Sequence, residues 1–318
     1  MLATLLLFFG AACAVPGSAD SGHSVRVVVL GTAQDGGLPQ IGCEEEACRA
    51  ARRHIALRRL VTSLLLVDER SGRRWLLDAS PDLSEQVERM RGHPAGRTNA
   101  AADGTRLPIV DGIFLTHAHM GHYTGLLHLG REAYGASGVT TFASASMAAF
   151  LAGNGPWSLM VETGALELVT LEPDVLVRLA DDLTVTPIEV PHRPELSNTL
   201  AFVIRGPERA LLYLPDIDKW ERWDRRIEDL IAEVDVALLD GTFFAEGEVP
   251  GRDMAEIPHP FMVESLARFA DLPAAERAKI VFTHLNHTNP AADPSSEAAR
   301  SVVRAGMWIA RDGQVFGL

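Results

Sequence analysis

DGIFLTHAHMGHYTGLLHLGRE, residues 111–132, joins a short apolar run to a cluster of histidines. The run, residues 113–115, is typical of a buried strand, and His117, His119 and His122 follow it closely. Imidazole is the commonest protein ligand of zinc and similar ions, and a loop that leaves a strand end can turn alternate side chains toward one point. The alternatives are a surface run of histidines or hydrogen-bonded core histidines, but the spacing favours a metal site. A helix is expected to begin at His122.

The string THAHMGH resembles the His-x-His-x-Asp-His signature of the metallo-β-lactamase fold superfamily, with Gly121 in the place of the aspartate. The resemblance implies an αββα four-layer sandwich, an α/β fold in which two sheets pack face to face with helices outside. A second stretch, GTAQDGGLPQIGC at residues 31–43, resembles the start of the pyrroloquinoline-quinone biosynthesis protein B (PqqB) branch. We expect this stretch to form a tight loop at the rim of the site. Residues 23–318 are expected to form one domain.

The resemblance also implies where the other metal ligands stand. His192 and His284 each follow an expected strand and match the third histidine and the last ligand of the superfamily. A carboxylate bridges two metals in this superfamily, and Asp216 follows its expected strand more closely than the competing Asp218 does. The implied first metal position consists of His117, His119 and His192, and the second consists of His122, His284 and the bridging Asp216.

Four more residues are implied to act around the metals. Asp78, in LLDASPD, would support the metal loop by accepting a hydrogen bond from a ligand imidazole. Asp240, in DGTFF, would support the ligands or face the substrate, although a turn role is equally compatible with its position. His259 would touch the substrate and act in catalysis with Asp216, or would only begin a helix. His287 is an extra imidazole that would support the ligands or replace one of them.

These residues favour a metal-dependent hydrolase that holds one or two Zn²⁺ ions and acts on an ester, lactone, amide or phosphoester. Zinc lowers the pKa of its bound water to about 7, so the ion would supply hydroxide at neutral pH. Gly121 can neither bind the second metal nor orient the nucleophile, which predicts a weakened second position. One alternative is a PqqB-like iron-dependent oxidase or hydroxylase acting on a tyrosine-derived precursor, because a histidine-rich site with one carboxylate also suits iron. The other is a metal-binding protein without catalysis.

The charge of the chain restricts its partners. Lys and Arg number 29 against 42 Asp and Glu, which gives a net charge of −13. A strongly acidic chain repels phosphate backbones, which weighs against a nucleic-acid partner and favours a small-molecule substrate. The oligomeric state is not specified by the sequence.

The first residues are typical of an export signal. Residues 2–15 form an apolar run that is too short to span a bilayer as a helix and that ends in small residues. Residues 1–22 are therefore predicted to be a signal peptide and leader, and a periplasmic location is expected. Cleavage after Ala14 and lipidation of Cys13, which would anchor the chain to the membrane, are both compatible with this segment.

The other two cysteines, Cys43 and Cys48, stand five positions apart. In an exported protein they could form a disulfide, and in the cytosol they could supply half of a structural zinc site. The PqqB branch has a denser cysteine cluster than this pair, so the sequence leaves both alternatives open.

Overall fold

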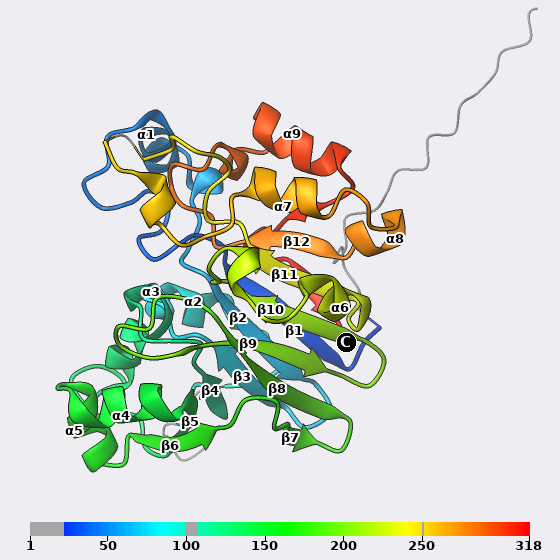
Figure 1. The fold of residues 1–318 in the computed structure, drawn as a ribbon. Coiled ribbons are helices and arrows are strands. Elements are labelled where there is room, and N and C mark those ends of the chain that lie inside the picture. The colour runs from blue at the N-terminus through cyan, green and yellow to red at the C-terminus, as the bar shows by residue number, and fades with distance from the viewer. Residues whose placement is uncertain (1–21, 99–106, 250) are drawn as a thin grey trace, which may run out of the picture.

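The computed structural model describes residues 22–98, 107–249 and 251–318, which contain two mixed seven-stranded sheets (Figure 1). The sheet orders are β14-β1-β2-β3-β4-β5-β6 and β13-β12-β11-β10-β9-β8-β7. The strands of the first sheet are β1 (Val25–Gly31), β2 (Ser63–Asp68), β3 (Arg73–Leu77), β4 (Gly112–Phe114), β5 (Val139–Ser144), β6 (Leu166–Leu171) and β14 (Val315–Gly317). Those of the second are β7 (Val177–Ala180), β8 (Leu183–Val190), β9 (Thr199–Arg205), β10 (Ala210–Leu214), β11 (Val236–Asp240), β12 (Ile280–Thr283) and β13 (Trp308–Ile309). The predicted leader up to residue 21, with Cys13 and Ala14, lies outside the described residues.

The central strands are apolar on both faces because both faces are buried. In β1, the side chains of Val25, Val27 and Val29 enter the core between the two sheets. The alternate side chains of Val28 and Leu30 belong to a second core on the outer face of the same sheet. Since successive side chains of a strand point to opposite faces, only an unbroken apolar run can fill both cores.

Aromatic side chains join the two sheets in the core between them. Phe114 of the first sheet stacks on Phe142 with ring centroids 4.4 Å apart, and it meets the edge of Phe202 of the second sheet at 5.6 Å. Trp75 and Tyr213 fill the same core and are almost completely buried. This face-to-face packing accounts for the middle two layers of the fold.

Helices form the outer layers (Figure 1). Side chains of α2, α4 and α5 contribute to the core outside the first sheet, and those of α6, α7 and α9 contribute to the core outside the second. The helices are α1 (Glu46–Arg53), α2 (Leu83–Arg89), α3 (Met120–Tyr123), α4 (Ala145–Gly153), α5 (Trp157–Glu162), α6 (Ile227–Ala232), α7 (Met262–Arg268), α8 (Ala274–Arg277) and α9 (Glu297–Arg304). The predicted αββα four-layer sandwich is confirmed. Among the described helices, none has both the length and the apolar character that a membrane crossing requires.

The helix after the histidines differs from its prediction. The structure has a four-residue helix, α3, which begins at Met120 rather than His122 and gives way to a 3-10 helix over Thr124–Leu129. The reason is the close passage of this segment over the end of β3. The N–H of Gly125 donates to the carbonyl of Ala79, and a Cβ at position 125 would lie 2.0 Å from the carbonyl oxygen of Ser80.

Candidate metal centre

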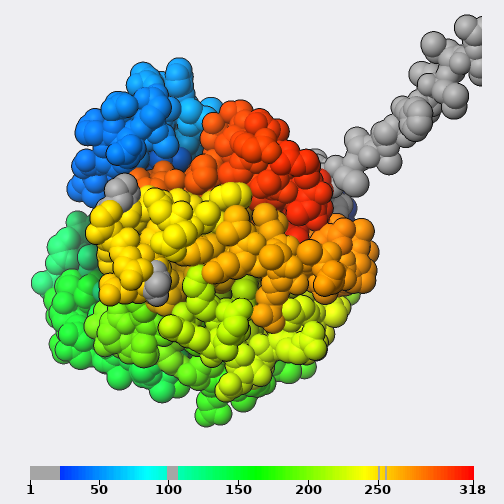
Figure 2. Space-filling model, turned by 45° about the horizontal axis from the view of Figure 1, so that its top comes forward, coloured from blue at the N-terminus to red at the C-terminus, as the bar shows by residue number. Residues whose placement is uncertain are grey.

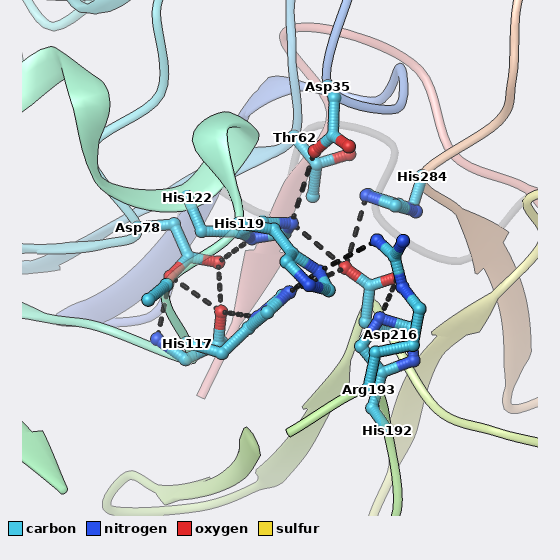
Figure 3. A network of polar contacts seen from close by, with 12 residues as sticks. Asp35, Thr62, Asp78, His117, His119, His122, His192, Arg193, Asp216 and His284 are labelled. Atoms are coloured by element: carbon cyan, nitrogen blue, oxygen red, sulfur yellow. Dashed lines mark hydrogen bonds and ion pairs between the residues drawn. The ribbon is translucent and has the colours of Figure 1, made fainter. Parts of the chain in front are cut away.

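The predicted ligands lie together at one edge of the two sheets (Figure 3). The histidine loop, residues 116–123, follows β4 of the first sheet. His192, Asp216 and His284 follow the carboxyl ends of β8, β10 and β12 in the second sheet. These three strands run in the same direction, because β8 and β10 both pair antiparallel with β9 and because β10, β11 and β12 are parallel. Their ends therefore deliver side chains to one edge, opposite the histidine loop.

Asp216 stands at the centre of this group. Its Oδ2 lies close to three imidazole Nε2 atoms, at 2.8 Å for His122, 3.3 Å for His284 and 3.6 Å for His117. Its Oδ1 lies 3.8 Å from Nε2 of His192. The side chain of Asp216 is only 3% exposed. A carboxylate at this place can contact cations on both of its sides.

Besides the groups that contain Asp216, the ligand atoms form two groups, each with all of its atoms within 4.8 Å of one another. The first group consists of His117, His119 and His192, the three histidines assigned to the first position by the resemblance. The second consists of Asp35, His122 and His284. The sequence places the loop of Asp35 at the rim of the site but gives its carboxylate no role. The signal that could have found it is the acidic residue in GTAQDGG, in a loop expected to border the metals.

Several buried polar atoms in this group have no hydrogen-bond partner among the described residues. They are Oδ1 of Asp35, Nδ1 and Nε2 of His192 and Nε2 of His284. Buried polar atoms are normally paired, because an unpaired one loses its hydration without compensation. A divalent cation accepts electron pairs from these kinds of atom, so the residues present fit a metal.

The imidazoles have the protonation behaviour of ligands. Burial, reinforced by the neighbouring imidazoles, holds the pKa values of His117 and His284 well below their ordinary value, so both rings are neutral. Burial also lowers the pKa of His122, but Asp78 and Asp216 outweigh it and hold that pKa well above the ordinary value. The two carboxylates thus favour a positive charge at His122, which a cation can supply in place of the proton.

Asp78 supports the histidine loop from behind. Its fully buried carboxylate accepts hydrogen bonds from Nδ1 of His122 at 2.8 Å, from the N–H of Thr116 at 2.8 Å and from the hydroxyl of Tyr213 at 3.1 Å. The Thr116 hydroxyl, which is also bonded to Asp78, contacts Nδ1 of His117 at 3.0 Å. These contacts set the orientation of two ligand rings.

Asp240 has the corresponding place in the second sheet. Its carboxylate contacts Nδ1 of His259 at 2.8 Å and accepts from the N–H of Ile217 at 3.1 Å. Nδ1 of His259 lies 3.5 Å from Oδ1 of Asp216. Burial lowers the pKa of His259, but the charge of Asp240 and its hydrogen bond outweigh burial and raise that pKa. Asp240 therefore positions both His259 and the loop that carries Asp216.

Comparison with known proteins gives this arrangement a family. Residues 73–285 match the beta-lactamase superfamily domain. Coenzyme PQQ synthesis protein B (PqqB) of Methylobacterium nodulans is 30% identical over 327 residues, a match that covers 92% of this chain and 100% of the relative. The chain belongs to the PqqB family. This confirms the resemblance of its histidine loop and of its first loop.

Solved structures share the fold of this chain. The PqqB-family chain is similar to the crystal structure of Zn²⁺-bound PqqB from Methylobacterium extorquens, with a TM-score of 0.75, 24% identity, and coverage of 92% of this chain and 100% of that one. It is also similar to the crystal structure of a new diphosphatase from the PhnP family, with a TM-score of 0.64, 22% identity, and coverage of 92% and 96%. At these identities the similarity shows a shared fold.

Two residues that the sequence suggests as metal ligands or their supports, Asp218 and His287, lie outside the group around Asp216. The carboxylate of Asp218 accepts from Nη1 of Arg222 at 2.7 Å, so of the two competing residues Asp216 is the one among the histidines. His287 was predicted to support or replace a ligand, but the structure places it with the free thiols of Cys43 and Cys48, with ligand atoms within 4.8 Å. The turn after His284 carries His287 away from the Asp216 group. The described cysteines form no disulfide.

A cavity of about 600 Å³ borders the metal centre of this PqqB-family chain. Its walls include residues 40–45, residues 256–258 with Val249 and Arg252, and residues 286–288. Figure 2 shows the first two of these segments near one another, in blue and yellow, on one face. Arg193, Phe243 and His259 also line it. Because His259 lies beside Asp216, a molecule in this cavity is within reach of the metal centre.

The loop that borders this cavity contains a carboxyl group whose pKa is high. Burial raises the pKa of Glu248 from 4.5 to about 7, although its Oε1 accepts from the N–H groups of Phe244 and Ala245. The folded protein therefore holds this proton more tightly than the unfolded chain does. The preference of the folded state for protonated Glu248 stabilises the fold fully below pH 4.5, and this contribution is lost as the pH rises through 7.

We therefore expect Glu248→Gln to flatten the pH dependence of stability. Between pH 4.5 and 7 the free energy of unfolding should fall by roughly 1–2 kcal/mol more in the parent protein than in Glu248→Gln, after allowance for solvent screening. Urea denaturation at several pH values measures this difference. Glu246→Gln, at an exposed position of the same loop, is the control and should follow the parent protein. Identical profiles for all three proteins would contradict the prediction.

Proposed function

We propose that this PqqB-family protein is a metal-dependent enzyme that oxidises or hydroxylates a small aromatic precursor in coenzyme PQQ synthesis. The observation that carries the proposal is the group of histidines around Asp216, with its unpartnered buried atoms, in a chain that matches coenzyme PQQ synthesis protein B over 92% of its length. A site of histidines and few carboxylates suits non-haem iron as well as zinc. When bound, iron would supply redox chemistry with oxygen, whereas zinc would supply Lewis acidity.

The protein's own residues would bind and orient the reactants. Asp78 and Asp240 hold the rings of His122 and His259 through their Nδ1 atoms. This leaves Nε2 of His122 for the metal, and it leaves the second nitrogen of His259 to exchange a proton with a molecule in the cavity. The raised pKa of His259 suits a group that donates that proton.

The cavity suits a partly aromatic substrate that bears a carboxylate. Arg193 and Arg252 line it beside acidic residues, and their guanidinium groups are suited to carboxylates. The acidic lining residues are Glu44, Glu45 and Glu256. Phe243 provides an aromatic side chain against which a planar ring can pack. A small carboxylate-bearing aromatic molecule combines both features.

Hydrolysis is the second candidate function. It is favoured by the position of Asp216 between two ligand groups, since a pair of metals bridged by one carboxylate is well suited to hydrolysis of esters and phosphodiesters. The same convergence weighs against a metal-binding protein without catalysis. If Gly121 marked a decayed site, the remaining ligands would have no reason to stay in register.

Metal identity separates the two candidates. Plasma mass spectrometry on the protein purified without a histidine tag should find iron, and the iron-loaded protein should take up oxygen when an aromatic precursor is added. Zinc together with turnover of a nitrophenyl ester or of bis(p-nitrophenyl) phosphate would favour hydrolysis instead. Protein that binds neither metal would contradict both.

A further inference from the structure

Gly121 is the residue at which the histidine loop departs from the superfamily signature, and the structure shows what fills the space beside it. A Cβ built at position 121 would lie 2.1 Å from Oδ1 of Asp35 and 2.9 Å from its Cα. Both distances are shorter than real Cβ contacts. The first loop, residues 32–37, therefore occupies the volume that a side chain at position 121 would need.

The first loop is held in this place by backbone hydrogen bonds from two directions. The N–H of Ala33 donates to the carbonyl of Leu60, and that of Gln34 donates to the carbonyl of Leu285, both at 2.9 Å. Leu285 directly follows the ligand His284 and donates back to Thr32 at 2.8 Å. The position of Asp35 is thus fixed relative to a metal ligand.

The carboxylate of Asp35 points toward the second ligand group (Figure 3). Its Oδ1 lies 3.7 Å from Nε2 of His122. This oxygen and Nε2 of His284 are buried and have no hydrogen-bond partner among the described residues. Nε2 of His122 lies between this oxygen and Oδ2 of Asp216, which is 2.8 Å away. One carboxylate oxygen and two imidazole nitrogens, all within 4.8 Å, are a ligand set for a divalent cation.

We propose that Asp35 supplies the carboxylate of the second metal position, in the space where the superfamily signature places the side chain of residue 121. The second position would then be held by Asp35, His122, His284 and the shared Asp216. This inference rests on the proposed metal-dependent function and replaces the expectation, drawn from Gly121 alone, of a weakened second position. It also makes the glycine a requirement of the site, because a side chain at 121 would displace the residue that binds the metal.

Metal titration tests the proposal. Metal-free parent protein should bind two equivalents of Zn²⁺ by calorimetry, and two of Co²⁺ by visible absorption. Asp35→Ala should keep the first equivalent and lose the second. Asp35→Asn, which preserves the shape, should raise the second dissociation constant at least about tenfold. Glu195→Gln removes a carboxylate 3.4 Å from His119 that is 51% exposed, and it should leave both equivalents unchanged.

A structural role for Asp35 predicts a different result. If Asp35 only held the loop, Asp35→Asn would destabilise the metal-free protein in urea. If Asp35 is a ligand, the metal-free protein should lose no stability, because its Oδ1 is unpaired there, and only the stabilisation by Zn²⁺ should shrink.

Moving the carboxylate gives a second test. In the double variant Asp35→Gly, Gly121→Asp, the contact at 2.1 Å is removed, and the first loop must shift to relieve the remaining contact, 2.9 Å from the Cα of residue 35. The double variant should bind the second equivalent more tightly than Asp35→Gly alone. If it binds that equivalent no more tightly, a carboxylate at position 121 does not replace one at position 35.

Two unchanged equivalents in Asp35→Ala, or only one in the parent protein, would overturn the role of Asp35. Parent protein that binds no cation would overturn the proposed function itself.

Discussion

Asp216→Asn is expected to abolish stable metal binding and to reduce turnover by roughly a thousandfold or more. Loss of a residue that only supports a ligand typically costs 10–100-fold in metal affinity, and Asp216 contacts both ligand groups directly. The amide keeps the volume of the carboxylate but carries no negative charge to offset two cations. Metal content per chain after gel filtration, measured by plasma mass spectrometry, checks the first half of the prediction.

Asp218→Asn is the matched control. Asp218 lies two residues away and is mostly buried, but its carboxylate is bonded to Arg222 and to the N–H of Lys219 rather than to an imidazole. The Asp218→Asn variant should therefore retain its metal and most of its turnover. Equal metal loss in the two variants would show that metal binding depends on the total charge of this loop and not on the position of Asp216 between the ligand groups.

Asp78→Ala is expected to produce the largest loss of folding stability, about 3–5 kcal/mol. The substitution leaves the N–H of Thr116, the ring of His122 and the hydroxyl of Tyr213 without their buried partner. Each unsatisfied buried donor costs about 1–3 kcal/mol, and removing one member of a buried charged pair costs a similar total. Urea denaturation of the metal-free protein measures the loss. Metal affinity should also fall 10–100-fold, because the ring of His122 is no longer oriented.

Two further variants separate the contributions at this position. Tyr213→Phe removes one donor and leaves the other contacts of Asp78 intact, so it should cost only about 1 kcal/mol. Asp78→Asn keeps an acceptor for Thr116 but removes the charge beside His122, so it should weaken metal binding more than it weakens the fold. If Asp78→Ala were no more destabilising than Tyr213→Phe, the carboxylate would not be the centre of this network.

The fold and most of the centre could be predicted because their signals are local. Each of His192, Asp216 and His284 stands within two residues of a strand end, and strand ends are where such a fold places functional side chains. Residues 220–232 are amphipathic, which predicts one helix, but the structure has a 3-10 turn at Trp220–Arg222 and α6 from Ile227. The first turn is held by a tertiary contact instead, because the indole of Trp220 donates to the hydroxyl of Ser265.

Asp35 and His287 show what local signals could not supply. Asp35 reaches His122 from a loop far upstream, and only the three-dimensional contact at Gly121 connects the two. His287 lies three residues after the ligand His284, yet a turn closed by the bond from the N–H of Asn289 to the carbonyl of Asn286 sends it toward the cysteines. The short spacing between His284 and His287 therefore overestimates how close their side chains lie. The long spacing between Asp35 and His122 hides that these two lie close together.

The ligands are divided between the two sheets. The histidine loop, Asp35 and Asp78 belong to the first sheet, whereas His192, Asp216 and His284 belong to the second. A bound cation would therefore link the two sheets of the sandwich at this edge. Strand pairing within each layer does not depend on the ion, and backbone bonds between the first loop and Leu285 also cross this edge. Loss of the ion would therefore loosen the contact between the layers at this edge while each sheet stayed intact.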